Sequence, residues 1–309
     1  MNAQRMQSPR IAVIVPCYNE EVAIGTVVGQ FKAVLPSSTV YVYDNASSDR
    51  TSEVARAAGA VVHFEPRKGK GNVVRRMFAD VDADIYIMVD GDATYDARSS
   101  LEMIDRLTSG NLDMVVANRQ SEVVAAYRAG HQFGNRLFNR ILETLFNSSF
   151  QDIFSGYRAF SRRFVKSFPA ASTGFDIETE LTVHALELSM PVGEIESPYG
   201  ARPEGSESKL RTYRHGSMIL WRIMILYKEV RPFQFFSAIA LVLALTSVVL
   251  VYPIVVTYLE TGLVPRFPTA ILATGLMILA FISITCGLIL DSVRRGRRET
   301  KHLLYLQQT

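Results

Sequence analysis

Residues 85–95 read IYIMVDGDATY, an apolar run that ends in two aspartates separated by one glycine. A short run of this kind, rich in Ile and Val, is typical of a buried strand. Similar runs lie at 11–15, 39–43, 61–64 and 114–117, and amphipathic helical patterns separate them at 22–34, 51–58, 72–78 and 101–107. Strands that alternate with helices predict an α/β fold with a mainly parallel sheet and helices on both of its faces.

Polar segments follow four of these runs at the point where each run ends. They are PCYNEE at 16–21, DNASSD at 44–49, RKGKG at 67–71 and DGD at 90–92. Ligands of parallel α/β sheets bind beyond the carboxyl ends of the strands. We therefore expect the four segments to line one crevice.

Asp90 and Asp92 are the candidate metal ligands of this crevice. Mg²⁺ and Mn²⁺ prefer oxygen ligands and commonly bridge protein carboxylates to a diphosphate. Two aspartates in this spacing also occur in ordinary turns. Their position beside three other polar strand ends favours the metal site.

The basic turn at 67–71 is a candidate phosphate site, because backbone N–H groups and cationic side chains can face a phosphate together just before a helix. A solvated basic turn is the alternative, and the GxxxxGK[ST] spacing of an NTPase is missing. Asp44 is placed to accept hydrogen bonds from a nucleobase. Asp49 and the 19–21 segment can instead cap helices.

Two runs near the end of the chain, 235–258 and 267–290, each hold 24 residues without a charge. At about 1.5 Å per residue, each run spans about 36 Å, enough to cross a bilayer with some tilt. Buried core helices are the alternative. Cationic residues precede the first run and follow the second, which places both ends of the hairpin in the cytoplasm by the positive-inside rule. They include Lys209, Arg211, Arg214, Arg222, Lys228, Arg231, Arg294, Arg295, Arg297, Arg298 and Lys301.

The composition excludes several classes of protein. The 309 residues are 48% hydrophobic, which excludes a disordered chain, and the two apolar runs exclude a freely soluble enzyme. The net charge of +3 does not favour nucleic acid as a partner, and two cysteines cannot form a disulfide framework. The polar first ten residues do not resemble a signal peptide, so the large domain is expected in the cytosol.

The chain is thus expected to have four parts. They are a cytosolic domain at 1–209, an amphipathic juxtamembrane helix at 210–232, two transmembrane helices within 233–291 (about 235–258 and 268–290), and a basic cytosolic tail at 292–309. Further helices are expected at about 133–146 and 176–188.

The segments VPCYNEE, YDNASSDRT, RKGKGN and VDGDATY, in this order, resemble the inverting family 2 glycosyltransferases of the GT-A (Rossmann-like) fold. DIFSGYRAFSRR at 152–163 and RPEGSESKL at 202–210, followed by two apolar runs, are similar to the polyprenyl-phosphate hexosyltransferases. That group includes dolichol-phosphate mannose synthase and the polyprenyl-phosphate glucosyltransferases.

The resemblance implies roles for individual residues. Asp92 and Asp90 would hold Mg²⁺ or Mn²⁺, and Asp152 with Asp92 would be catalytic. The expected nucleotide-sugar contacts are Pro16, Tyr18, Asn19, Glu20, Asp44, Asn45, Ser47, Lys70, Gly71, Asp90 and Gly91. The expected contacts to the acceptor or donor phosphate are Arg128, Arg136, Arg158, Arg202 and Lys209.

The expected reaction moves a hexose from a nucleotide sugar, with UDP-glucose or UDP-GlcNAc favoured, to undecaprenyl or dolichyl phosphate. GDP-mannose as donor, a lipid hydroxyl as acceptor, and a catalytically silent nucleotide-sugar sensor or scaffold are the alternatives. A phosphate monoester is mostly dianionic at neutral pH, because its second pKa is about 6. Asp152 is therefore expected to orient an arginine or the acceptor, whereas a lipid hydroxyl would need it as a base. The expected location is a plasma, inner or ER-type membrane, and a homo-oligomer is expected by analogy.

Overall fold

The computed structural model describes residues 8–120, 150–169, 177–203 and 224–308. The chain divides into two compact units. The first comprises Met1–Gly216 with Lys301–Thr309, and the second comprises Ser217–Thr300. Each unit is described by itself.

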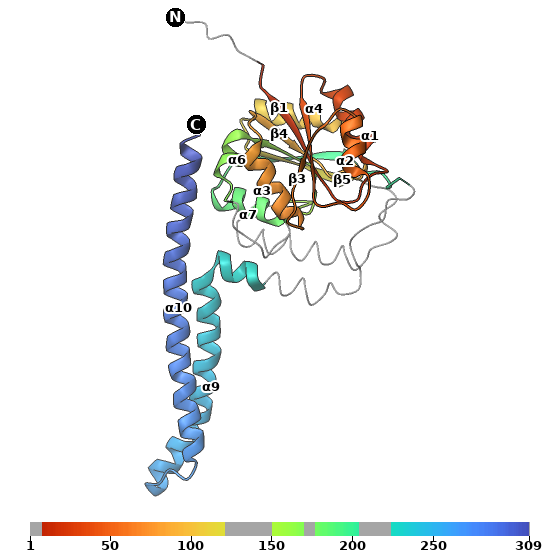
Figure 1. Ribbon diagram of the computed structural model, residues 1–309. Coiled ribbons are helices and arrows are strands. Elements are labelled where there is room, and N and C mark those ends of the chain that lie inside the picture. The colour runs from red at the N-terminus through yellow and green to blue at the C-terminus, as the bar shows by residue number, and fades with distance from the viewer. Residues whose placement is uncertain (1–7, 121–149, 170–176, 204–223, 309) are drawn as a thin grey trace, which may run out of the picture. The chain divides into compact units, whose positions relative to one another are not determined.

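The first unit alternates strands and helices along most of its length (Figure 1). Its elements are β1 (Ile11–Cys17), α1 (Ile24–Val34), β2 (Thr39–Asp44), α2 (Thr51–Ala57), β3 (Val61–Phe64), α3 (Lys70–Asp80), β4 (Ile85–Met88), α4 (Ser99–Ser109), β5 (Met114–Gln120), β6 (Arg158–Ser161), α6 (Arg162–Ser167), α7 (Ile177–Glu187) and β7 (Val192–Pro198).

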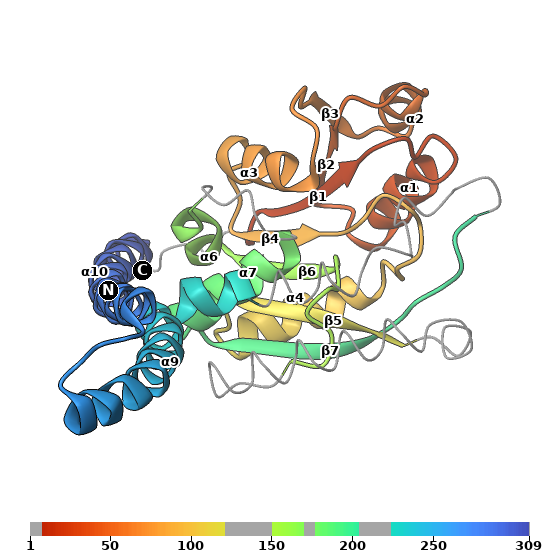
Figure 2. The ribbon, with the colours of Figure 1, turned by 90° about the horizontal axis from the view of Figure 1, so that it is seen from below.

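The strands form one sheet in the order β3-β2-β1-β4-β6-β5-β7, which can be followed across Figure 2. β1 pairs in parallel with β2 and β4, β2 with β3, and β5 with β7. β6 pairs antiparallel with both β4 and β5. The predicted α/β fold with a mainly parallel sheet is confirmed, with one antiparallel strand added in the middle.

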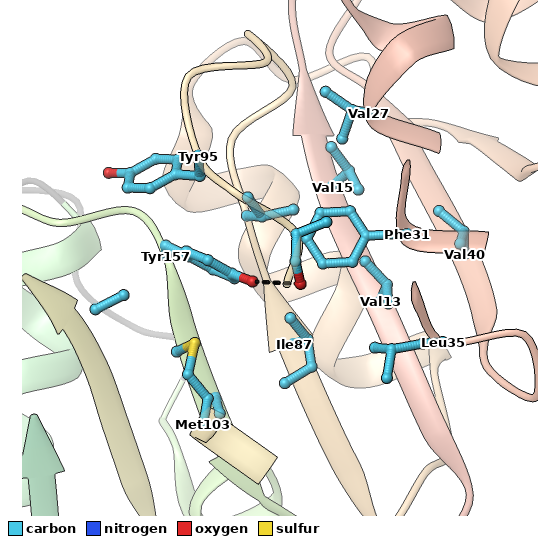
Figure 3. Close-up of a cluster of buried hydrophobic side chains, with 14 of the residues drawn as sticks. Val13, Val15, Val27, Phe31, Leu35, Val40, Ile87, Tyr95, Met103 and Tyr157 are labelled. Atoms are coloured by element: carbon cyan, nitrogen blue, oxygen red, sulfur yellow. Dashed lines mark hydrogen bonds between the residues drawn. The ribbon is translucent and has the colours of Figure 1, made fainter. Parts of the chain in front are cut away.

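Apolar side chains cover both faces of the sheet. On one face, Val13 and Val15 of β1 lie in a core cluster with Val27 and Phe31 of α1 and Met103 of α4 (Figure 3). On the other face, aromatic rings from α3, β6, α6 and α7 are in contact, namely Phe78, Phe160, Phe164 and His184. Burial on both faces explains why β1 and β4 read as continuous apolar runs.

The five predicted strands and the helix predicted at 176–188 are present, whereas β6, α6 and β7 were not predicted. The helix expected at 133–146 lies outside the described residues. So does most of the expected juxtamembrane helix, of which the structure describes a helical segment at 224–230.

The second unit holds α9 (Pro232–Thr261) and α10 (Phe267–Leu306) as far as Thr300, two long apolar helices whose length and composition suit a membrane span. α10 continues as helix through most of the expected basic tail. Apart from Pro232 at the start of α9, the buried residues of the two helices are mostly small and recur every seven positions, as in a helix pair that crosses at a shallow angle. They are Ala240, Ser247 and Ile254 in α9 and Ala273, Ala280 and Gly287 in α10.

The small residues allow close contact between the two helices. The Ser247 hydroxyl donates a hydrogen bond to the Ala273 carbonyl at 2.7 Å. A Cβ added to Gly287 would lie 3.0 Å from the Cβ of Phe236. The larger apolar side chains of the pair, by contrast, face outward.

Candidate functional site

The loops after β1 and β2 interlock, as the sequence predicts. The two strands are in parallel register to their ends, where Cys17 pairs with Asp44. The backbone N–H of Asn19 donates to Ser47 Oγ at 2.9 Å, and the N–H of Glu20 donates to Thr51 Oγ1 at 2.8 Å. Asn19 and Ser47, which were expected to touch the donor, therefore join the two loops to each other.

The third loop is tied to the second by Asn45. Its side-chain amide donates to the carbonyls of Glu65 (3.1 Å) and Arg67 (2.7 Å) and accepts from the N–H of Gly69 (2.7 Å). Gly69 has φ +120°, in the region that favours glycine. Asn45 thus fixes the turn from which α3 starts.

Asp44 is the last residue of β2 and Tyr18 follows β1, and their side chains have different surroundings. The Asp44 carboxylate is buried and accepts hydrogen bonds from Ser52 Oγ (2.7 Å) and from the N–H of Ser47 (2.9 Å). The Tyr18 ring is exposed, with Lys68 Nζ 5.6 Å from its centroid. An exposed aromatic ring and a buried carboxylate at the ends of neighbouring strands suit the stacking and hydrogen bonding of a nucleobase. Pro16 and Gly91 are buried, and Gly71 lies in the first turn of α3.

The Lys70 ammonium joins two carboxylates from different parts of the chain. Its Nζ contacts Asp90 Oδ1, beyond the end of β4, and Glu178 Oε1 in the first turn of α7 at 2.5 Å. Burial alone would lower the pKa of Lys70, but the charges and hydrogen bonds of the two carboxylates outweigh burial and raise it. A Cβ at Gly156 would overlap the Asp90 carboxylate, so the chain there approaches Asp90 as closely as glycine allows.

Asp92 is buried and also has a cationic partner. Its carboxylate accepts from Thr94 Oγ1 at 2.6 Å and forms an ion pair with Arg202 Nη2 at 2.7 Å. The structure thus brings the predicted phosphate-binding Arg202 to the predicted metal ligand. Both carboxylates of the DGD segment face cationic side chains.

Asp152 is held by Arg119, a residue that the sequence analysis did not single out. Arg119 donates two hydrogen bonds to it, from Nε at 2.6 Å and from Nη2 at 2.8 Å. Burial lowers the pKa of Arg119, but the hydrogen bonds and charge of Asp152 outweigh it and raise the pKa. The guanidinium also lies 5.6 Å from the centroid of the Tyr199 ring. Arg119 sits at the carboxyl end of β5, so the rule that located the other four polar segments could have found it.

Arg158 is fully buried, although the sequence suggested a contact to phosphate. Its guanidinium donates to the carbonyls of Ile153 (2.5 Å) and Ser155 (2.9 Å) and to Thr182 Oγ1 (2.9 Å). Burial lowers its pKa to about 10, which leaves it charged at neutral pH. Arg158 therefore joins the Asp152 loop to α7, and we leave it out of the phosphate-binding set.

The other expected phosphate contacts, Arg128, Arg136 and Lys209, lie outside the described residues. Glu178, which the sequence analysis did not select, lies 108 positions after its partner Lys70. No spacing in the sequence indicates that contact.

The DGD segment fits a hard divalent cation by the chemistry of its oxygen donors. In the described part of the chain, no group of three or more His, Cys, Asp or Glu side chains gathers as a metal site. Two carboxylates leave most of the coordination shell to substrate and water. Mg²⁺ is commonly bound in this way, through one or two carboxylates and the phosphates of a substrate.

Residues 12–168 match the family model described as glycosyl transferase family 2. The chain belongs to glycosyl transferase family 2. The sequence-based recognition of this family is confirmed, and the protein is a glycosyltransferase.

Its relatives include two proteins of Haloferax volcanii. Glycosyltransferase AglJ is 32% identical over 231 residues, which cover 74% of this chain and 76% of AglJ. A dolichyl-phosphate hexose transferase is 27% identical over 210 residues, which cover 68% of this chain and 90% of that protein.

Among solved structures, the chain is similar to glucosyl-3-phosphoglycerate synthase from Mycobacterium tuberculosis in complex with Mn²⁺, UDP and phosphoglyceric acid. The TM-score is 0.59 at 22% identity, over 72% of this chain and 79% of the synthase. This likeness confirms the GT-A fold of the first unit.

Proposed function

We propose that this glycosyltransferase moves a hexose, with inversion, from a UDP-sugar to the phosphate of a polyprenyl lipid. The observation that carries the acceptor assignment is the double hydrogen bond between Arg119 and Asp152. A carboxylate held in this way is poorly placed to remove a proton, and a phosphate dianion has no proton to lose at the attacking oxygen. The name of the dolichyl-phosphate hexose transferase and the two apolar helices support the same acceptor.

The proposed binding site for the nucleotide sugar consists of residues at and after the ends of the strands. Tyr18 and Asp44 would bind the base, and Lys70 and Arg202 would lie near the diphosphate. Asp90 and Asp92 would hold Mg²⁺ or Mn²⁺, which when bound stabilises the negative charge of the departing nucleoside diphosphate. The Mn²⁺ and UDP of the structurally similar synthase support this assignment.

The acceptor side follows from Arg119. About a third of its side chain is exposed, and Asp152 fixes the plane of the guanidinium. Such a group can hold a phosphate while one phosphate oxygen attacks the anomeric carbon. The new bond joins that oxygen to the sugar, and the bond to the diphosphate breaks on the opposite side, which inverts the configuration.

The apolar helices would keep the enzyme in the same thin layer as its lipid acceptor. The cationic residues around them favour a cytosolic catalytic domain with both termini on that side of the membrane. Labelling of an added cysteine near either terminus with a membrane-impermeant reagent, in intact and in opened cells, tests this orientation.

The test of the function is transfer by the purified full-length protein in detergent, with Mn²⁺ or Mg²⁺, polyprenyl phosphate and a panel of UDP- and GDP-sugars. Mass spectrometry should detect one polyprenyl-phosphate sugar, formed from a UDP-sugar. A product formed only from GDP-mannose would correct the donor. Transfer only to diacylglycerol or ceramide would replace the acceptor, and nucleotide binding without any product would favour a sensor or scaffold.

A further inference from the structure

Glu178 is a nearly buried carboxylate that the reaction described above does not use. It lies in the first turn of α7, and its side chain is 12% exposed. Its partner is Lys70 Nζ, at 2.5 Å from Oε1. The same ammonium contacts Asp90, which belongs to the proposed metal pair. Glu178 is therefore linked to the proposed donor site through Lys70.

Lys70 has two carboxylate partners, and only Asp90 is a proposed metal ligand. For Asp90 to bind a divalent cation, the ammonium has to give up its contact with Asp90. Glu178 offers a second anion to which the ammonium can hold. Without the charge of Glu178, Lys70 would pair with Asp90 alone and would compete with the metal for that carboxylate.

We propose that Glu178 is a positioning residue that draws Lys70 away from Asp90 and so allows Asp90 to take up the metal with the donor. This role rests on the proposed function, because it concerns the same metal and nucleotide site. Glu178 itself would touch neither the substrate nor the metal.

The surrounding contacts hold Glu178 at a fixed place. Thr182 Oγ1 donates to the Glu178 backbone carbonyl at 3.0 Å and accepts from Arg158 Nη1 at 2.9 Å. The other donors of the fully buried Arg158 hold the 153–155 loop, one residue from Gly156, which faces Asp90. Arg158 thus contacts both α7, which carries Glu178, and the loop that precedes Gly156. An acidic group in the first turn of a helix is also favoured by the helix dipole.

The test is the affinity for Mn²⁺ in the presence of UDP, measured from the EPR signal of free Mn²⁺ with the full-length protein in detergent. We expect Glu178→Gln to weaken Mn²⁺ binding about tenfold, equivalent to about 1.4 kcal/mol. This is the low end for a hydrogen bond to a charged group, because Lys70 is partly exposed. At saturating Mn²⁺, kcat should return to nearly the wild-type value.

Lys70→Met separates this role from a simple loss of charge or of structure. If Glu178 acts by holding Lys70, Glu178→Gln should change Mn²⁺ affinity less than about twofold when Lys70 is already replaced by methionine, because the coupling between two contacting residues then vanishes. Glu187→Gln is the matched control: Glu187 lies on the same helix and pairs with Lys301 at 2.8 Å. It should leave Mn²⁺ affinity unchanged.

Each outcome decides between the two proposals. If the wild type does not bind Mn²⁺ in the presence of UDP, both the proposed function and the positioning role of Glu178 are refuted. If the wild type binds and Glu178→Gln binds equally well, the positioning role is refuted while the function stands. An equal loss of affinity on Glu178→Gln substitution in the wild-type and in the Lys70→Met backgrounds also refutes it. If Glu178→Gln does not fold, Glu178→Asp serves instead: it keeps the charge but shortens its reach, and the weaker binding should again vanish in the Lys70→Met background.

Discussion

We expect Asp152→Asn to slow sugar transfer by about ten- to a hundredfold without abolishing it. The Asp152 carboxylate accepts two guanidinium hydrogen bonds from Arg119, at 2.6 and 2.8 Å. Asparagine keeps one acceptor oxygen, but it loses the charge and turns an N–H donor toward the guanidinium. Hydrogen bonds to charged groups contribute about 1.5–3 kcal/mol. Arg119 is 31% exposed, and water offsets part of that loss. A loss of about 1.4–2.8 kcal/mol in the transition state corresponds to the stated range.

The assay is steady-state transfer with each substrate varied in turn. Because Arg119 is proposed to hold the acceptor, KM for polyprenyl phosphate should rise while the affinity for UDP stays constant. The rate should also increase with pH through about 6 in both the wild type and the variant, because the acceptor phosphate becomes a dianion there. If Asp152 were the base, the variant would lose its residual activity.

Asp113→Asn is the control for a general loss of stability. Asp113 is a fully buried carboxylate that accepts a hydrogen bond from Arg163 at 3.0 Å, just before β5 begins. Arg119 lies near the other end of that strand. The control should unfold more easily and transfer sugar at the normal rate while folded. Complete loss of transfer in Asp152→Asn, in protein that folds and binds UDP, would refute our reasoning.

Three further predictions concern the donor site and the core. Asp92→Ala should abolish transfer and Mn²⁺-dependent UDP binding, as measured by calorimetry, and preserved binding would argue against Asp92 as a ligand. Gly156→Ala should weaken that binding because its Cβ overlaps the Asp90 carboxylate, whereas Gly200→Ala, whose Cβ would lie 3.8 Å from its nearest neighbour, should not. Burial lowers the pKa of His184 to about 3, so below about pH 6.5 only the unfolded chain takes up this proton and stability falls by about 1.4 kcal/mol per pH unit. Urea unfolding between pH 7 and 5 should show this fall in the wild type in excess of that in His184→Gln, and equal slopes would contradict it.

The sheet was predictable where its strands are buried on both faces. β1 and β2 have parallel neighbours on both sides, and β4 lies between β1 and β6, so the apolar runs of these three strands stand out in the sequence. β6 was missed because it begins with Arg158, ends with Ser161 and holds only two apolar residues between them. An arginine in a sequence normally indicates a surface position. Arg158 is buried because α7 and the loop before β6 supply hydrogen-bond acceptors for its guanidinium.

The loops of the site were also predictable, but the partners of their charges were not. The sequence indicates that Asp90, Asp92 and Asp152 are functional candidates because each follows a recognisable pattern. It does not indicate that Arg119 reaches Asp152 across 33 positions or that Lys70 reaches Glu178 across 108 positions. These contacts join elements far apart in the sequence, β5 with the segment before β6 and α3 with α7, which only the folded chain brings together.

These ion pairs distinguish two kinds of cation in the proposed reaction. Lys70 and Arg202 contact the two aspartates that would bind the metal. These ion pairs therefore have to change when the metal and the nucleotide sugar bind. Arg119 contacts an aspartate outside the metal pair, so its contact can persist from the free enzyme to the transition state. A guanidinium that is already oriented needs no reorganisation during the reaction. Substitutions on the donor side should therefore change the metal requirement, whereas substitutions at Arg119 and Asp152 should change KM for the acceptor at every metal concentration.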